Sequence, residues 1–238
     1  MAIYEFPSHL YDDRNGHYMR ITATPGAISG STFNPAQADT FVLPMPMGKD
    51  SYSYKQRHTY GDVKLSRVAL GMMGMSGYAD AIETTASLLG APLNPAIEVI
   101  YESTNLREFT FAFLFAPETE QESIAVENIC RRMRFHAAPE ILGGGTTGAR
   151  QGWFAASPSK FKIDYNVLVN GRWERNDTSG TPKLPKIYEG YIDAIGVNYA
   201  PAEGLYSTFS NGYPVAVEMA ISFKETRIID KRMINDGY

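Results

Sequence analysis

The sequence predicts a mainly β fold of the α+β class, with one amphipathic helix packed against the strands. Several segments alternate apolar and polar residues with a period of two, the pattern of a strand with one buried face. Asn-Gly pairs at 170–171 and 211–212 indicate tight turns next to such segments. One window, 119–136, instead combines helical spacing of its apolar residues with capping signals at its start.

Bulk composition excludes several classes of protein. The 238 residues suffice for one large domain or two small ones, and 44% hydrophobic with 20% charged residues is typical of a soluble globular protein. A net charge of -4 argues against general nucleic-acid binding, and the lone Cys130 excludes an intramolecular disulfide framework. We expect no secretory signal, because the N-terminus shows no basic segment followed by an apolar one. We expect no membrane span, because no uncharged apolar run reaches about 20 residues.

The strand expected over residues 107–116 has the strongest signal. Phenylalanine fills four alternate positions, which places four rings on one face: Phe109, Phe111, Phe113 and Phe115. Burying one such ring is worth roughly 1.5–3 kcal/mol, so the row contributes about 6–12 kcal/mol. A whole domain is stable by only about 5–15 kcal/mol. The row must therefore be covered, and the small residues on the other face suit a strand covered on both sides.

A helix follows this strand at once. Pro117 ends the strand, Thr119 is the expected N-cap, and Glu122 three residues later completes a capping box. Acids gather in the first turn and bases in the last, as the helix dipole favours. Apolar residues at helical spacing form the face expected to lie on a sheet: Val126, Ile129, Cys130 and Met133.

The C-terminal half is expected to contain further strands. Residues 161–169 alternate and lead through Asn170-Gly171 to a return strand beginning at 172–175. Residues 187–199 are predicted to form another strand, interrupted by two glycines. After the turn at 211–212, residues 215–223 alternate cleanly and predict a half-buried strand.

The N-terminal part is less regular. Residues 22–50 are rich in Thr, Pro, Gly and Ser and are expected to be irregular or extended. Residues 64–90 predict a weak or broken helix, because Gly71, Gly74 and Gly77 each cost about 0.5–1 kcal/mol relative to alanine. We therefore divide the chain into an extension that makes assembly contacts, 1–90, and a β domain, 91–238. Under this division, deleting residues 1–60 would leave the β domain folded.

No local pattern indicates catalysis, a cofactor or a metal. We interpret His136 at the helix end as complementing the dipole, and Cys130 in the apolar stripe as a core residue. The glycine-rich segment 143–148 lacks the Lys-Ser/Thr pair of a phosphate loop and is interpreted as a linker or turn. The histidines show no paired spacing for metal ligands: His9, His17, His58 and His136. We expect no enzyme activity.

Segments between residues 92 and 235 follow one another in a distinctive order. An Asn-Pro pair comes first, followed by an arginine with an aromatic strand, a proline and a capped acidic helix. Two middle strands come next, PSKFKIDYNVL and LPKIYEGYIDAIGVNYAP. Gly-x-Pro precedes the last strand, and Glu-Thr ends it. This order resembles the tail-tube initiator proteins at the baseplate–tube junction of contractile-tailed bacteriophages. The residues that carry the resemblance form an expected assembly signature: Asn94, Pro95, Arg107, Phe109, Phe111, Phe113, Phe115, Pro117, Thr119, Glu122, Gly212, Pro214 and Glu225.

The resemblance implies a tail-tube-like β-barrel or sandwich with one flanking helix, assembled as a homohexameric ring at the baseplate. The hairpins of six copies would join into one large barrel around a channel through which DNA passes non-specifically, and closing the sheet would remove its open edges. The ring would initiate tail-tube polymerisation. Implied partners are a second tube-like initiator, the major tail tube protein, baseplate hub or wedge proteins and the tape-measure protein. The implied location is the virion, with assembly in the host cytoplasm.

Three alternatives stay open from the sequence. The first is the major tail tube protein itself, or an equivalent ring of a contractile injection machine, which would share the fold and differ in self-polymerisation. The second is an enzyme whose active-site residues are scattered along the chain. The third is a β-rich module that binds a cell-surface ligand through its loops.

Overall fold

The computed structural model describes residues 2–8, 10, 17–26, 38–64, 97–142, 154–169, 172–175, 184–201 and 205–238. They belong to two compact units: unit 1 comprises Met1–Lys55 and Leu106–Tyr238, and unit 2 comprises Gln56–Asn105. This division differs from the boundary expected at residue 90, because strands from the N-terminal and C-terminal parts of the chain form one sheet.

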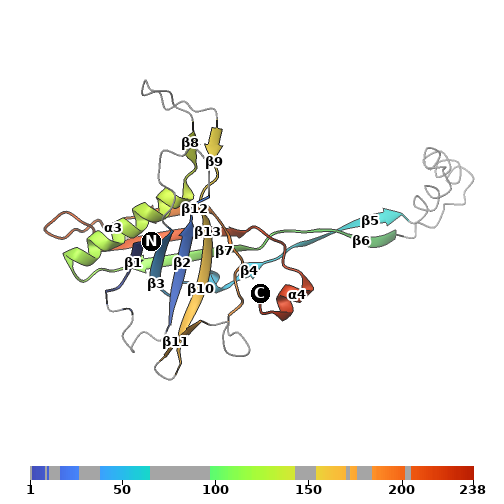
Figure 1. Ribbon diagram of the computed structural model, residues 1–238, viewed down its shortest axis with the longest axis horizontal. Coiled ribbons are helices and arrows are strands. Elements are labelled where there is room, and N and C mark those ends of the chain that lie inside the picture. The colour runs from blue at the N-terminus through green and yellow to red at the C-terminus, as the bar shows by residue number, and fades with distance from the viewer. Residues whose placement is uncertain are drawn as a thin grey trace, which may run out of the picture. The chain divides into compact units, whose positions relative to one another are not determined.

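Unit 1 is built on a nine-stranded mixed sheet, ordered β1-β3-β2-β10-β12-β13-β7-β4, with β11 paired to β10 (Figure 1). β1 runs parallel to β3, and the other pairs are antiparallel. The sheet of this single chain is open and not closed as a barrel. The strands are β1 (Ala2–Glu5), β2 (His17–Thr24), β3 (Asp39–Pro44), β4 (Tyr54–Lys55), β7 (Glu108–Phe115), β10 (Lys160–Val169), β11 (Arg172–Arg175), β12 (Gly190–Asn198) and β13 (Val217–Glu225).

Two parts of this sheet meet at one point. β10 and β12 pair through a single couple, Phe161 with Gly190. In Figure 1, β2, β3 and β10 run steeply across the direction of β7, β12 and β13. A Cβ at position 190 would lie 2.2 Å from the backbone oxygen of Lys224. Glycine is therefore required where the two parts of the sheet come together.

The phenylalanine row of β7 is buried as predicted. β7 pairs with β13 along its whole length, and each ring of the row is opposite an apolar residue of β13, as in Phe111 with Ile221. All four rings are at most 5% exposed. Their neighbours in the same core come from both parts of the sheet, including Met19, Phe41 and Phe161.

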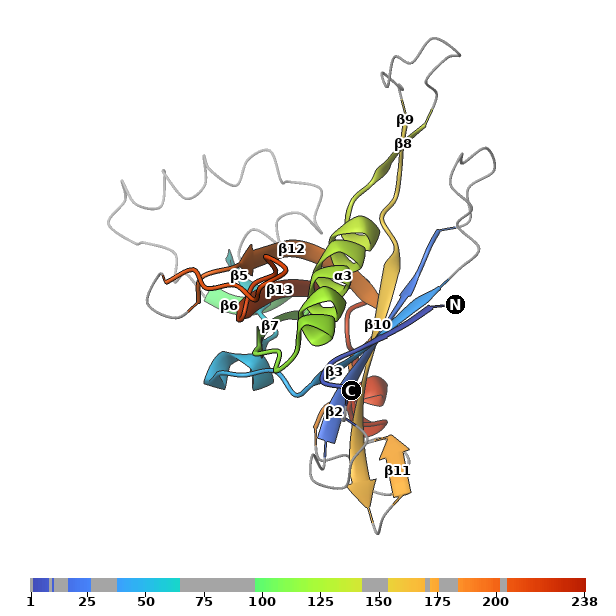
Figure 2. The same cartoon turned by 90° about the vertical axis from the view of Figure 1, so that its left-hand side faces the viewer.

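The helix α3 (Glu120–Ala137) packs against the face of the sheet that carries the phenylalanine row, and Figure 2 shows α3 in front of the sheet. Thr119 is its N-cap, and the Thr119 hydroxyl accepts a hydrogen bond from the backbone N–H of Glu122 at 3.2 Å. The predicted apolar stripe is confirmed, because its four residues are fully buried: Val126, Ile129, Cys130 and Met133. The prediction of an amphipathic helix flanking a mainly β domain is therefore confirmed, and this helix has 18 residues.

Two N-terminal strands, β2 and β3, lie inside the sheet. β2 pairs with β10 from His17 to Thr24, and β3 pairs with β2. Residues 22–50, expected to be irregular or extended, include the end of β2 and the whole of β3. β3 is buried on both faces, with Thr40 to Leu43 all at most 3% exposed. A strand covered on both sides shows no alternation, so the sequence pattern did not single out β3 within this segment.

The short 3₁₀ helix η1 (Lys49–Tyr52) and β4 cover part of the edge of β7. The N–H of Met47 donates to the carbonyl of Ala112 at 2.6 Å, and the N–H of Ala112 donates to Ser51 Oγ at 3.2 Å. β4 adds the pair Tyr54–Phe109. At the other end of the sheet, β1 is the terminal strand and leaves Ile3 exposed.

Three short elements complete unit 1. β8 (Glu140–Leu142) and β9 (Phe154–Ala156) form a small antiparallel pair, and α4 (Lys231–Asn235) follows β13. The predicted return strand after residue 169 is confirmed as β11, the strand predicted over 187–199 is β12, and the strand predicted over 215–223 is β13. The helix predicted over 64–90 lies outside the described residues, apart from the end of a strand at residue 64.

Unit 2 is described as a two-stranded antiparallel ribbon of β5 (His58–Lys64) and β6 (Ile97–Thr104), which we call the β5–β6 ribbon. Four of its apolar or aromatic side chains are exposed, and they lie on both faces because consecutive residues of a strand point to opposite sides. Tyr60 is 57% exposed, Val99 66%, Ile100 46% and Tyr101 54%. A two-stranded ribbon is marginally stable alone in water.

Candidate functional site

The first polar site of unit 1 is an ion pair between Arg107 and Glu225. Arg107 Nε donates to Glu225 Oε2 at 2.7 Å, and Nη2 donates to Oε1 at 2.6 Å, so the pair is bidentate. Both side chains are at most 1% exposed. The backbone joins them as well, since the N–H of Glu225 donates to the carbonyl of Arg107 at 3.1 Å.

The surroundings satisfy the rest of this pair. Arg107 Nη2 also donates to the carbonyl of Lys186 at 3.0 Å, and Glu225 accepts from the N–H of Tyr188 at 2.7 Å. The guanidinium lies over the ring of Tyr54, with 4.9 Å from its carbon to the ring centroid. A buried pair costs desolvation, and removing one partner usually costs about 3–5 kcal/mol. The pair thus cross-links β13, the start of β7 and the segment before β12.

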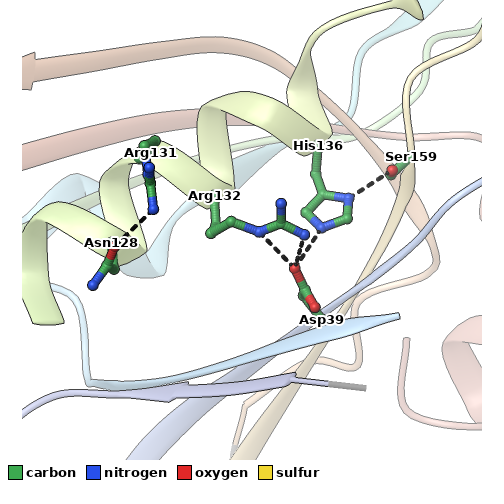
Figure 3. A network of polar contacts seen from close by, with 6 residues as sticks. All are labelled: Asp39, Asn128, Arg131, Arg132, His136 and Ser159. Atoms are coloured by element: carbon green, nitrogen blue, oxygen red, sulfur yellow. Dashed lines mark hydrogen bonds and ion pairs between the residues drawn. The ribbon is translucent and has the colours of Figure 1, made fainter. Parts of the chain in front are cut away.

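The second polar site joins the end of α3 to the sheet (Figure 3). His136 Nε2 lies 3.0 Å from Asp39 Oδ2, and His136 Nδ1 lies 2.9 Å from Ser159 Oγ. Arg132, one turn earlier in the helix, donates to the same Asp39 oxygen through Nε at 2.9 Å and also through Nη2. The N–H of Ser159 donates to the carbonyl of His136 at 3.0 Å. Asp39 opens β3 and Ser159 precedes β10, so three elements meet here.

The electrostatics of this network centre on Asp39. Burial by itself raises the pKa of the Asp39 carboxyl, but hydrogen bonds from His136 and Arg132, together with their charges, outweigh burial and hold the pKa below its usual value. His136 was interpreted as a residue that complements the helix dipole. Its ring is instead buried between Asp39 and Ser159. The local sequence carried no signal for this contact.

A Ser–His–Asp chain is also the arrangement of nucleophilic hydrolases, so its chemistry needs testing against the geometry. In those enzymes the serine hydroxyl gives its proton to Nε2, and the carboxylate binds Nδ1. Here the two nitrogens are exchanged, Arg132 also binds Asp39, and all three members of the chain are at most 8% exposed. The arrangement is suited to holding elements together, because its three buried members come from three different segments of the chain.

A third polar cluster surrounds the start of α3. The Glu122 carboxylate accepts from the N–H of Glu118 at 3.0 Å and from both the N–H and the hydroxyl of Ser8, at 3.1 and 2.6 Å. Ser123 Oγ donates to the carbonyl of Pro214 at 2.7 Å. Gly212, with φ +83°, forms the turn before Pro214, a backbone conformation that favours glycine. The helix start is therefore held by the N-terminal segment and by the β12–β13 loop.

The residues of the expected assembly signature lie in different places. Arg107 and Glu225 meet directly, and the four phenylalanines lie in the core. Asn94 and Pro95 lie outside the described residues. The remaining members lie around the start of α3 or in the loop that contacts it: Pro117, Thr119, Glu122, Gly212 and Pro214.

Other chemical groups offer little reactivity within the described ranges. Cys130 is buried as predicted, and burial, with the nearby Glu127 carboxylate, raises the pKa of its thiol to about 12. Among these residues no cluster of three or more His, Cys, Asp or Glu side chains is placed to hold a metal ion. The described helices include none that is both long and apolar enough to cross a membrane.

Comparison with known proteins adds no further constraint. No model of a known protein family matches this sequence, and the search of curated proteins returned no match.

Proposed function

We propose that this chain is a structural subunit of a homohexameric ring at the baseplate of a contractile phage tail, and that the ring initiates polymerisation of the tail tube. The observation that carries the proposal is the β5–β6 ribbon, whose apolar residues are exposed on both faces. The sequence resemblance to tail-tube initiators supports the proposal, and the tail-tube-like barrel would form only when several copies assemble.

The β5–β6 ribbon supports assembly on energetic grounds. The ribbon exposes apolar surface whose burial against a partner would be energetically favourable. The exposed residues are Tyr60, Val99, Ile100 and Tyr101. Its two strands have open outer edges among the described residues, which are hydrogen-bonding sites for another strand. Another copy of the same chain would meet both needs, and ring closure would leave no unpaired ribbon.

Unit 1 supports the proposal as the rigid part of such a subunit. Its core joins the phenylalanine row to α3, and the Arg107–Glu225 and Asp39–His136 contacts tie distant segments together. A ring that starts a polymer must present a fixed surface to the next ring. Buried, fully bonded polar groups favour one arrangement over many, which suits that requirement.

The open face of β7, β12 and β13 is the proposed wall of the DNA channel. The lysine on this face, Lys224, is paired with Glu108 at 2.8 Å, and the hydrogen bond and charge of that carboxylate raise the pKa of the ammonium. A wall whose cation is already paired offers the phosphate backbone little to hold. Opposite positions along the face carry small residues: Thr110, Ala112, Ala194, Gly196, Ala220 and Ser222.

The proposed partners are a second tube-like initiator, the major tail tube protein, baseplate hub or wedge proteins and the tape-measure protein. The proposed location is the virion, after assembly in the host cytoplasm. The second candidate is the major tail tube protein or an equivalent ring of an injection machine. The same ribbon supports both candidates, and they differ in whether rings stack into long tubes.

The decisive experiment is electron microscopy of particles from a phage whose copy of this gene carries an early stop. Baseplates that lack tubes and sheaths are the expected result, and normal infectious tails would remove the proposal. Purified protein separates the two candidates, since single rings support an initiator and long tubes support a tube protein.

A variant pair links the phenotype to the β5–β6 ribbon. Ile100→Glu places a charge on a residue of the ribbon that is 46% exposed, whereas Ile228→Glu places one on an apolar residue of unit 1 that is 47% exposed. Native mass spectrometry should show loss of rings in the first variant and retention in the second. Equal ring formation by both would argue against the ribbon as the assembly element.

A further inference from the structure

The residues that follow β13 fold into a small unit around α4, residues 230–238, which we call the clasp. Its helix has five residues, too few for a helix to be stable alone in water. Asp230 caps the start, because its Oδ1 accepts hydrogen bonds from the N–H groups of Arg232 and Met233, both at 2.9 Å. The Met233 side chain is buried, so the clasp packs on the rest of unit 1.

The end of the clasp is fixed by a Schellman motif. The N–H of Tyr238 donates to the carbonyl of Met233 at 3.0 Å. The N–H of Gly237 donates to the carbonyl of Ile234, also at 3.0 Å. Gly237 has φ +94°, a backbone conformation that favours glycine. The motif thus fixes the backbone at Gly237, and with it the direction of the Gly237 carbonyl.

This carbonyl begins a chain of hydrogen bonds that ends at the buried pair of Arg107 and Glu225. The Gly237 carbonyl accepts from the N–H of Lys186 at 2.7 Å. The carbonyl of Lys186 in turn accepts from Arg107 Nη2 at 3.0 Å. Two residues later, the N–H of Tyr188 donates to Glu225 Oε1 at 2.7 Å. The segment from Lys186 to Tyr188 therefore bonds the clasp on one side and both members of the pair on the other.

Side chains reinforce the same connection. The Tyr238 ring lies 6.1 Å from the Tyr188 ring, centroid to centroid, and the Lys186 ammonium lies 5.7 Å from the centroid of the Tyr238 ring. Ring pairs at this spacing attract each other, and so do a cation and a ring. Among the described residues, no hydrogen bond joins the clasp directly to Arg107 or Glu225. The clasp therefore acts on the pair through the segment between them.

The pair depends on this segment because both of its charges are buried. Arg107 and Glu225 are at most 1% exposed, so water does not replace a hydrogen bond that either of them loses. Displacing Lys186 and Tyr188 would remove one acceptor from the guanidinium and one donor from the carboxylate.

We propose that the clasp is a conformational lock on this pair. When the clasp is closed, Lys186 and Tyr188 hold Arg107 and Glu225 in their bidentate arrangement, and opening the clasp loosens the pair. Such a coupling is reciprocal, so weakening the pair also loosens the clasp. The lock lies within one chain, and its test therefore does not depend on ring formation.

Amide hydrogen exchange of the full chain, followed by NMR, tests the lock at single residues. Gly237→Ala should strain the Schellman motif and raise the exchange rates of the Lys186 and Tyr188 amides by about tenfold. Gly212→Ala is the matched control, because Gly212 also has a positive φ, +83°, but lies in the β12–β13 loop. The control should leave both amides unchanged.

A second pair of variants tests the ring of Tyr238. Tyr238→Phe keeps the ring and should preserve both exchange rates. Tyr238→Ala should raise the exchange rates of the Lys186 and Tyr188 amides by about threefold or more. Equal rates in the two variants would mean that the ring does not hold the segment, which would overturn the proposal.

Reciprocity separates a lock from a merely local contact. Glu225→Gln weakens the pair and should raise the exchange rate of the Lys186 amide relative to the amides of β2. An unchanged Lys186 amide in this variant would overturn the proposal. A Gly237→Ala variant that affects Lys186 but not Tyr188 would do the same, and so would one that raises exchange equally throughout β7 and β13.

Discussion

Unit 1 and the β5–β6 ribbon differ in the burial of their aromatic residues. In unit 1 four phenylalanines are buried between a helix and a sheet, and distant polar residues close the structure around them. In the β5–β6 ribbon, tyrosines and aliphatic residues face solvent on both sides of two strands. The comparison teaches that one chain can combine a part whose apolar residues are covered with a part whose apolar residues are exposed.

The largest expected effect comes from removing chain segments. Deleting residues 1–26 removes β1 and β2, and β2 pairs with β10 along eight residue pairs, so unit 1 should not fold. This replaces the expectation that a deletion of residues 1–60 would leave the β domain folded. Replacing residues 56–105 by a short glycine-rich linker should leave unit 1 folded. Circular dichroism and thermal unfolding measure the fold of both variants. A folded protein after deletion of residues 1–26, or an unfolded one after replacement of residues 56–105, would contradict the comparison.

Arg107→Met should destabilise unit 1 by about 3–5 kcal/mol, because it leaves the Glu225 carboxylate buried without its cation. The double variant Arg107→Met with Glu225→Met should recover much of that loss, since apolar replacement of a whole buried pair is often neutral. Urea unfolding measures the two free energies. If the double variant is as unstable as the sum of the single variants, the pair is not a coupled unit.

Asp39→Asn should cost about 1–3 kcal/mol at neutral pH, because Arg132 and His136 lose their charged acceptor. The folded-state pKa of Asp39 lies below its ordinary value of 3.8, so its contribution is present above that value and is lost as the pH falls through the folded pKa. The variant should therefore lose less stability than the wild type on acidification below about pH 4. Urea unfolding at several pH values tests this, and parallel curves would contradict it.

Thr119→Ala removes the hydroxyl that caps α3 and should cost about 1 kcal/mol. Thr119→Ser keeps the hydroxyl and serves as the control. The midpoint of urea unfolding measures both. A serine variant as unstable as the alanine variant would point to the lost methyl group rather than the cap.

The smallest effect is expected in the β5–β6 ribbon. Tyr101→Ala should change the stability of the free monomer by less than about 0.5 kcal/mol, because the side chain is 54% exposed. The same change should weaken ring formation under the proposed function. Denaturant unfolding of the monomer and native mass spectrometry separate the two effects. A large loss of monomer stability would show that the ribbon packs within its own chain.

Sequence reasoning succeeded where the signal was local. The phenylalanine row and the Thr119 cap each depend on residues a few positions apart, and both were predicted correctly. The contacts that close unit 1 join residues far apart, 118 positions for Arg107 with Glu225 and 97 for Asp39 with His136. Arg107 and Glu225 were singled out only through the family resemblance. Their direct contact depends on tertiary packing and could not be predicted from either neighbourhood.

The covered edge of β7 also bears on how copies of this chain avoid uncontrolled aggregation. Met47, Ser51 and β4 occupy the edge of β7 near Ala112 and Phe109, whereas β1 ends the sheet on the other side. Fibre growth by sheet extension needs two compatible free edges on every molecule. With one edge blocked along part of its length, the main sheet has less free edge on which another strand could add.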